Sequence, residues 1–264
     1  MKHEFVLRKM PVRPADPVAY FLDMDDDFLA LNPLIGRKFR FEHTGYQCLS
    51  CGSDEPIYAR GFCKKCFFEA PEAGRWFIHP EESKAHLGIE DRDLAYEQAV
   101  QLAPHVVYLA KTSDVKVGVT RRSQIPVRWI DQGADEAMII AETPNRYLAG
   151  VAEVALKPYV KDKTSWRGML RSRGGGADLE EIFRQLLPHL PEELRPYVVK
   201  EHRIYRFNYP VERMPELKSA YSFKKNKVIE GRLAGIKGQY LIFDDGHVLN
   251  IRNHEGYVVR LEVE

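Results

Sequence analysis

All four cysteines of this chain fall in one short segment, as two CxxC pairs. Cys48 and Cys51 form the first pair, Cys63 and Cys66 form the second, and eleven residues separate the two pairs. Two thiolates at this spacing can chelate one ion from a tight turn, and two such turns complete a tetrahedron around Zn²⁺. Because a four-thiolate site leaves no open coordination position, the predicted zinc holds structure and performs no chemistry.

The same spacing also permits two disulfides or a CxxC redox centre. Disulfides persist in oxidising compartments. The first residues of the chain contain no continuous apolar stretch with a small-residue cleavage site, so secretion is not expected. Two facing redox centres are less economical than one zinc ion. We therefore expect a cytoplasmic protein with one structural Zn²⁺.

The composition is that of an ordinary protein able to bury a hydrophobic core. Of the 264 residues, 44% are hydrophobic and 29% are charged. No apolar run approaches the roughly 20 residues that a membrane-spanning helix needs, so no membrane association is expected. The formal net charge of +1 excludes a uniformly basic coat for nucleic acid.

Positive charge is nevertheless concentrated locally. Lys and Arg outnumber Asp and Glu by 12 to 7 over residues 111–173, and by 9 to 4 over residues 200–232. One basic face could bind the phosphates of DNA or RNA, and the alternative is a set of ordinary solvated surfaces. The predicted nucleic-acid contacts are Gly118, Thr120, Arg121, Arg122, Lys163, Trp166, Arg167 and Arg171.

The central part of the chain alternates strand and helix signals. Residues 106–110 and 115–120 are short, β-branched runs that predict two strands of a hairpin. Pro126 suits the first turn of a helix. Residues 135–141 predict a third strand, and 145–160 predict an amphipathic helix that carries Glu153. The predicted order is strand, strand, helix, strand, helix.

This order, with its residues, resembles the GIY-YIG nuclease core. Val106-Val107-Tyr108 stands at the place of the first triplet, and Lys116-Val117-Gly118 stands at the place of the second. Lys116 replaces the second tyrosine, and the late asparagine of the family has no clear counterpart, with Ser165-Trp166 the nearest candidate. The run Val117-Gly118-Val119-Thr120, together with Arg128-Trp129-Ile130-Asp131-Gln132-Gly133-Ala134, more closely resembles an uncharacterised prokaryotic domain family of unknown function. That resemblance extends over most of the chain and implies no particular activity.

The GIY-YIG resemblance implies roles for four catalytic residues. Tyr108 would place the attacking water, Arg128 would grip the phosphate, and Glu153 would hold Mg²⁺ or Mn²⁺. Lys116 would either supply charge to the phosphate or mark a loss of catalysis. Independently of the resemblance, Glu153 lies on an apolar helix face, where an unpaired carboxylate would cost several kcal/mol, so a metal or an arginine must compensate it.

We therefore expect an α+β protein in three parts. These are a zinc-stapled N-terminal region (1–88), a GIY-YIG-like mixed α/β core (89–173), and a helical linker with a small β-barrel-like module (174–264). The leading function is nucleic-acid binding with metal-dependent phosphodiester hydrolysis. The alternatives are a catalytically degenerate DNA- or RNA-binding module and an RNA-modifying enzyme that grips its substrate with the same core. The sequence does not predict the oligomeric state.

Overall fold

The computed structural model of the protein describes residues 2–160, 165–172 and 176–264. The chain forms two compact units. Unit 1 combines the two ends of the chain, up to Ala73 and from Asn208 onward, and unit 2 runs from Gly74 to Phe207. Lys163 and the glycines at 174 and 175 lie outside the described residues.

Unit 1 is built mainly from β-strands. In chain order they are β1 (Lys2–Val6), β2 (Val12–Arg13), β3 (Ala19–Asp23), β4 (Phe28–Ala30), β5 (Lys38–Tyr46), β6 (Ile57–Ala59), β7 (Phe62–Cys63), β12 (Val228–Lys237), β13 (Tyr240–Phe243), β14 (Val248–Asn250) and β15 (Tyr257–Val263). Helical segments of the unit are α1 (Lys64–Glu69) and the 3-10 turns η1 (Asn32–Leu34), η2 (Pro71–Ala73) and η10 (Arg252–His254).

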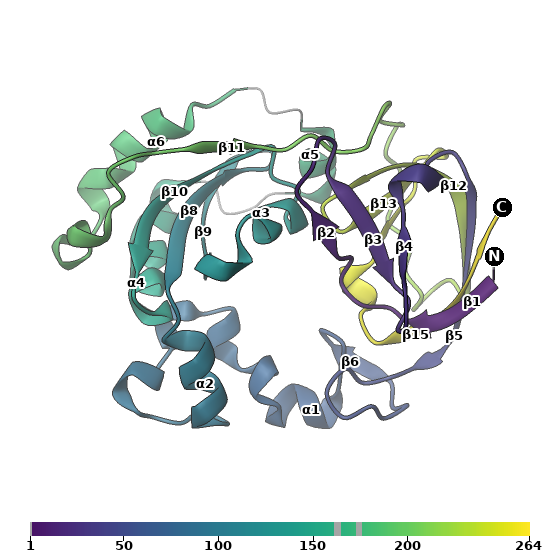
Figure 1. Ribbon diagram of the computed structural model, residues 1–264, viewed down its shortest axis with the longest axis horizontal. Helices are drawn as coiled ribbons and strands as arrows, with labels where there is room; N and C mark the ends of the chain where they lie inside the picture. The colour runs from purple at the N-terminus through teal and green to yellow at the C-terminus, as the bar shows by residue number, and fades with distance from the viewer. Residues whose placement is uncertain (1, 161–164, 173–175) are drawn as a thin grey trace. The chain divides into compact units, whose positions relative to one another are not determined.

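The main sheet of unit 1 joins strands from both ends of the chain. Its order is β1-β15-β5-β12-β13-β14, and its neighbouring strands are antiparallel. Strand β1, purple in Figure 1, lies beside the C-terminal β15. In β5, Phe39 and Phe41 are fully buried, as the alternation of apolar and charged residues predicts for a half-exposed strand.

This pairing changes two expectations. The unit boundaries differ from the division predicted at residues 88 and 173, because N-terminal and C-terminal strands share one sheet. In addition, a small β-barrel-like module was predicted for 174–264, but the described residues form no closed barrel. The sheet is open, with β1 and β14 at its edges, and β11 belongs to a sheet of unit 2.

Unit 2 contains a sheet with helices on both faces. The strands are β8 (His105–Lys111), β9 (Val115–Arg121), β10 (Glu136–Thr143) and β11 (Ile204–Arg206). The α-helices are α2 (Leu94–Gln101), α3 (Val127–Asp131), α4 (Arg146–Leu156), α5 (Trp166–Arg171) and α6 (Leu179–Leu186). The 3-10 turns are η3 (Arg75–Phe77), η4 (Pro80–Glu82), η5 (Ala85–Leu87), η6 (Arg122–Gln124), η7 (Lys157–Tyr159), η8 (Leu187–His189) and η9 (Glu192–Tyr197).

The predicted order of strand, strand, helix, strand, helix is confirmed as β8, β9, α3, β10 and α4. The strand order in space is β11-β10-β8-β9, with antiparallel pairs throughout. Helix α4 begins where Asn145 accepts a hydrogen bond from the Leu148 amide, an N-cap that satisfies one of the first amides of the helix. Gly133 has a φ of 68° just after α3 ends, a conformation that glycine commonly supplies at the end of a helix.

The two faces of this sheet carry different cores, and Figure 1 shows α3 and α4 on opposite sides of it. We call one the α3 face: it packs Val106, Tyr108, Ala110, Ala137 and the fully buried Trp129 together. We call the other the α4 face: it packs Val107, Leu109, Val115 and Val117 against Ala149, Ala152 and Leu156 of α4 and against residues of α6. None of the helices formed by described residues is long and apolar enough to cross a membrane.

Candidate metal centre and nucleic-acid surface

The four predicted zinc ligands come together in unit 1. The sulfur atoms of Cys48, Cys51, Cys63 and Cys66 all lie within 4.8 Å of one another, and none of the four forms a disulfide. The sulfurs of Cys51 and Cys63 are 3.9 Å apart. A tetrahedron with Zn–S bonds of about 2.3 Å places its sulfurs about 3.8 Å apart, so the cluster fits one Zn²⁺.

Local turns bring these cysteines together. Arg60 and Gly61 have φ angles of 55° and 80°, as the two central residues of a tight hairpin between β6 and β7 require. Cys63 ends that hairpin and begins α1, so Cys66 projects from the first turn of the helix. The amide of Cys63 also donates a hydrogen bond to the sulfur of Cys48 (3.3 Å), which joins the two pairs.

On the α3 face of unit 2, Tyr108 and Gly118 are direct cross-strand partners. A Cβ at position 118 would lie 2.6 Å from the Tyr108 hydroxyl oxygen, so only glycine leaves room for this ring. Tyr108 is fully buried, and the ring of Trp129 meets it edge-on at 5.8 Å. The glycine predicted to admit a phosphate therefore admits a tyrosine ring.

A polar network links this tyrosine to Arg128. A guanidinium has only donors, so the amide oxygen of Gln132 must face it. In that orientation the oxygen accepts hydrogen bonds from Arg128 Nε (2.9 Å) and Nη2 (3.0 Å) and from the Tyr108 hydroxyl (2.9 Å). Arg128 is therefore held by the buried tyrosine through Gln132.

Two further predicted residues share this face. Lys116 is the cross-strand partner of Ala110, and Thr120 is the partner of Val106. Lys116 is half-buried, whereas Thr120 is buried. Since side chains alternate along a strand, Lys116, Gly118 and Thr120 point to the same face as Tyr108. The structure thus brings together three of the four predicted catalytic residues, Tyr108, Lys116 and Arg128.

Glu153, the fourth, stands on α4, which packs on the opposite face of the sheet. Its side chain is 12% exposed and lies 3.4 Å from the Lys157 ammonium one helical turn on. Burial raises the pKa of the Glu153 carboxyl above its usual value, while the positive charges of Lys157 and Arg146 act against that rise. The carboxylate is therefore costly to keep charged, and a nearby cation would relieve that cost.

Arg146, at the start of α4, is the buried cation near Glu153. Its guanidinium donates to the carbonyl oxygens of Trp76 (2.9 Å) and Phe77 (2.8 Å) and lies over both rings. Burial lowers the pKa of Arg146 to about 10, with the charge of Glu153 opposing this shift and the charge of Arg128 adding to it. Arg146 therefore connects the segment around η3 to α4. The charges of both Glu153 and Arg128 act on its guanidinium.

A second carboxylate lies beside this helix. Turn η4 crosses α4 at Gly150, where an added Cβ would collide with the backbone of Pro80 and Glu81. The charge of Glu81 contributes to the raised pKa of Glu153 and also acts on Arg146. Glu81 is thus a second carboxylate whose charge acts on both charged groups of α4, and it also lies 3.4 Å from His79 Nδ1.

The other predicted nucleic-acid contacts divide between the two ends of β9. Arg121 ends that strand, and Arg122 forms an ion pair with Glu142. Helix α5 instead lies at the other end, since Gly168 approaches Ser113 in the β8–β9 turn. The strand between them spans about 20 Å. A single compact basic patch is therefore not formed by these residues.

On α5, the Arg167 guanidinium covers the ring of Trp166 at 4.3 Å. Arg167 and Arg171 are exposed, and Trp166 is partly buried. Lys163 lies outside the described residues.

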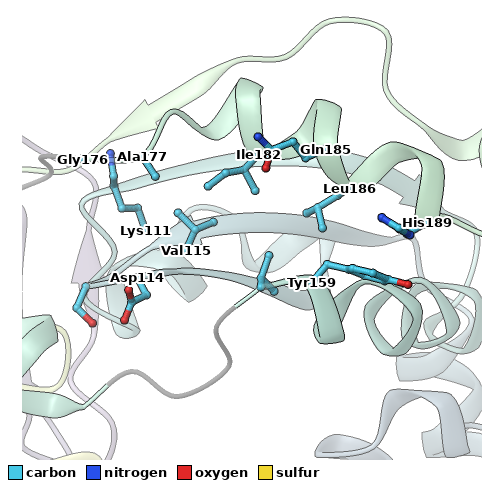
Figure 2. Close-up of a pocket in the computed structure, with 12 residues that line it drawn as sticks. Lys111, Asp114, Val115, Tyr159, Gly176, Ala177, Ile182, Gln185, Leu186 and His189 are labelled. Carbon is cyan, nitrogen blue, oxygen red and sulfur yellow. The ribbon is translucent and has the colours of Figure 1, made fainter.

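A pocket of about 570 Å³ lies on the α4 face, between the sheet and α6. Figure 2 shows Lys111 and Asp114 at one end, and Tyr159 and His189 at the other. The rings of Tyr159 and His189 stack at 3.6 Å. The pocket contains none of the predicted catalytic residues.

Sequence reasoning missed Gln132, Arg146 and Glu81. Gln132 had a usable signal, because it follows Arg128 by four residues and so lies on the same side of α3. Arg146 and Glu81 had none, since their importance depends on η3 and η4 packing on α4. No periodic pattern in residues 69–88 indicates that contact.

The fold and the cysteine cluster together define a mixed α/β protein with a cluster of four thiols that could hold a structural metal ion such as zinc. The chain belongs to the family described as "Protein of unknown function (DUF2797)", whose sequence profile matches residues 36–259. This match confirms the predicted membership of an uncharacterised domain family. No curated protein and no solved structure matches the chain. The GIY-YIG resemblance stays a prediction.

Proposed function

We propose that this protein binds nucleic acid and that unit 2 hydrolyses phosphodiester bonds with the help of a divalent cation. The observation that carries the proposal is the network of Tyr108, Gln132 and Arg128 beside Gly118. A guanidinium fixed at two of its nitrogens by one amide oxygen is oriented in advance. Its other edge suits the fork geometry of a phosphate.

In this proposal each residue has a separate task. Arg128 binds a phosphate oxygen, and Tyr108 acts as a positioning residue through Gln132, because its buried hydroxyl reaches Gln132 and not solvent. Lys116 adds positive charge on the same face. Glu153, with Glu81 beside α4, would hold Mg²⁺ or Mn²⁺, which when bound stabilises charge on phosphate and acidifies a water molecule.

A second candidate function is binding without turnover. It is favoured by the position of Glu153, which lies on α4 across the sheet from Arg128 and has Lys157 3.4 Å away. In that case the carboxylate balances the charges of Lys157 and the buried Arg146, and the α3 face remains a phosphate-binding surface. Lys116 in place of a tyrosine agrees with this candidate.

Glu153→Gln and Arg128→Ala separate the two functions. Each variant is tested for cleavage of single- and double-stranded DNA and RNA with Mg²⁺ and Mn²⁺, and for affinity without either ion. We expect Glu153→Gln to abolish cleavage and retain affinity, because it removes a cation ligand but no phosphate contact. Arg128→Ala should impair both, since a guanidinium on phosphate acts in the ground state and in the transition state.

Glu180→Gln and Arg184→Ala on the exposed side of α6 are matched controls, and both should behave as the parent. Melting curves accompany every variant. A parent that binds but cuts no substrate, together with a Glu153→Gln protein that melts much lower, would reject hydrolysis and support the binding module. A parent that neither binds nor cuts would reject both functions.

A further inference from the structure

A cluster of aromatic rings is exposed next to the cysteine cluster of unit 1. Tyr58 on β6 and Phe68 on α1 are 50% and 55% exposed, respectively. The ring centroids of Tyr58, Phe67 and Phe68 lie 5.0 to 5.6 Å from one another. We call these three residues the ring surface. Large exposed aromatic groups that gather in one place are typical of interaction sites.

The elements that carry the ring surface adjoin the cysteine core. Phe67 packs against the core that contains Cys48, Cys63 and Cys66. Tyr58 belongs to the β6–β7 hairpin that ends in Cys63, and Phe68 belongs to the helix that contains Cys66. A metal bound to the thiols would therefore fix both elements that carry the rings. A partner could stack on them with little loss of side-chain freedom.

Two lysines accompany the exposed ring of Phe68. Lys64 and Lys65 precede it by four and three residues on α1, so all three side chains lie on one side of the helix. Both lysines are exposed, and neither has an ion pair with any residue that the structure describes. Helix α1 thus carries two positive charges at its start and one negative charge, that of Glu69, at its end. Aromatic faces flanked by cations match the two components of a nucleic-acid strand, its bases and its phosphates.

We propose that the ring surface binds single-stranded nucleic acid, with unpaired bases stacked on Tyr58 and Phe68 and phosphates paired with Lys64 and Lys65. This deepens the proposed function and rests on it for the class of partner. Duplex bases are stacked inside the helix and are not available to such rings, so the surface selects single strands. An apolar protein segment would use the rings alone and would need neither their aromatic character nor the lysines.

The test compares the affinity of the zinc-loaded protein for two labelled ligands. One is an oligothymidine of about 12 nucleotides, within the usual site sizes for single strands, and the other is a duplex of equal length. Mg²⁺ and Mn²⁺ are omitted and no chelator is added, because a chelator would also strip zinc. We expect tighter binding of the single strand. Tyr58→Ala and Phe68→Ala should each weaken that binding by about fivefold or more, which is the lower range for the loss of one base–aromatic stack.

Three further variants define the chemistry. Phe68→Leu keeps apolar bulk but removes the aromatic face, and it should behave as Phe68→Ala. A Lys64→Gln/Lys65→Gln double variant should lower the salt dependence, by about 0.7 in log–log slope for each phosphate that no longer pairs with a lysine. Phe28→Ala is the matched control, because Phe28 is a 59% exposed phenylalanine on β4 beside Asp26 and Asp27, and it should bind as the parent does. The zinc content of each variant verifies that its cysteine cluster is still folded.

An unchanged affinity of Tyr58→Ala and Phe68→Ala would overturn the inference, and so would full retention of affinity by Phe68→Leu or equal loss in Phe28→Ala. A parent that binds no single strand would overturn it as well. Each of these outcomes is independent of cleavage by unit 2. If the parent cuts duplex but the ring-surface variants bind single strands as the parent does, this inference alone is refuted. If the parent binds single strands through the ring surface but cuts nothing, hydrolysis alone is refuted.

Discussion

At the scale of single residues, His105 is a buried titratable group whose protonation should affect stability. It is fully buried at the start of β8, where its Nδ1 lies 2.7 Å from the carbonyl oxygen of Ala103. Its Nε2 has no hydrogen-bond partner among the described residues. Burial lowers the pKa of His105 from 6.5 to about 4, and the charges of Arg146 and Arg121 act in the same direction.

This shift predicts a loss of stability in mild acid. The unfolded chain binds a proton at His105 below about pH 6.5, whereas the folded chain does so only near pH 4. The stability that neutral His105 contributes is therefore fully present above pH 6.5. As the pH falls from 6.5 to 4, the unfolding free energy decreases by about 3 kcal/mol in total. Urea unfolding at about pH 7.5, above this window, and at about pH 4.5, near its lower end, measures most of the loss. Between these two pH values the unfolding free energy of His105→Gln should fall by about 2.5 kcal/mol less than that of the parent, and an equal fall in parent and variant would contradict the prediction.

Gly118→Ala tests the contact on which the Arg128 network depends. The added Cβ would lie 2.6 Å from the Tyr108 hydroxyl and must displace the ring. We expect a destabilisation of about 1–3 kcal/mol, as for other overpacked sites. In the control Gly45→Ala, on β5, the Cβ would meet no atom within 4 Å, so stability should change by less than about 0.5 kcal/mol. Equal unfolding free energies for both variants would show that Tyr108 is not confined by Gly118.

At the scale of elements, the cluster of four cysteines gives the most direct prediction. The purified protein should contain about one Zn²⁺ per chain, and Cys63→Ser should lose it. Removal of zinc by a chelator should unfold the segment from Cys48 to Cys66, because structural zinc contributes on the order of 10 kcal/mol of apparent binding free energy. Elemental analysis and a melting curve with and without chelator provide the test. A fully folded, metal-free protein would contradict the zinc assignment.

Arg146 should be essential for the packing of η3 on α4. Arg146→Ala leaves two carbonyl oxygens without their donors, those of Trp76 and Phe77. Each loss costs about 1–3 kcal/mol. The unfolding free energy should fall accordingly, and hydrogen exchange in 74–82 should accelerate. Arg184→Ala, which removes an exposed ion pair on α6, should change stability by less than about 1 kcal/mol. Unchanged exchange in 74–82 would show that other contacts hold the segment.

What the sequence could predict at this scale depended on local patterns. Short-range signals found β8, β9, α3, β10 and α4 in the right order, together with the four cysteines. Turns η3 and η4 escaped prediction because short 3-10 segments have no periodicity. The placement of Glu153 across the sheet from Arg128 depends on which face α4 covers, and the sequence of the helix does not specify that.

At the scale of the whole molecule, the sequence could not predict which strands would share a sheet. The pairing of β15 with both β1 and β5 joins residues more than 200 positions apart. Such a pairing has no local signature, since any half-buried antiparallel strand shows the same alternation. The consequence is a chain whose two ends form one unit and whose middle forms the other, where a linear division into three parts was predicted.

The salt dependence of nucleic-acid binding tests most directly the claim that this protein binds nucleic acid. Affinity for a labelled duplex and a labelled single strand is measured between low and physiological salt, for the parent, for an Arg167→Ala/Arg171→Ala double variant and for the Arg184→Ala control. The account predicts a steep fall in affinity, with a slope of about 0.9 per phosphate contact on duplex and about 0.7 on single strands. It predicts a shallower slope for the double variant alone. Affinity that stays flat with salt, or no affinity for either strand form, would contradict it.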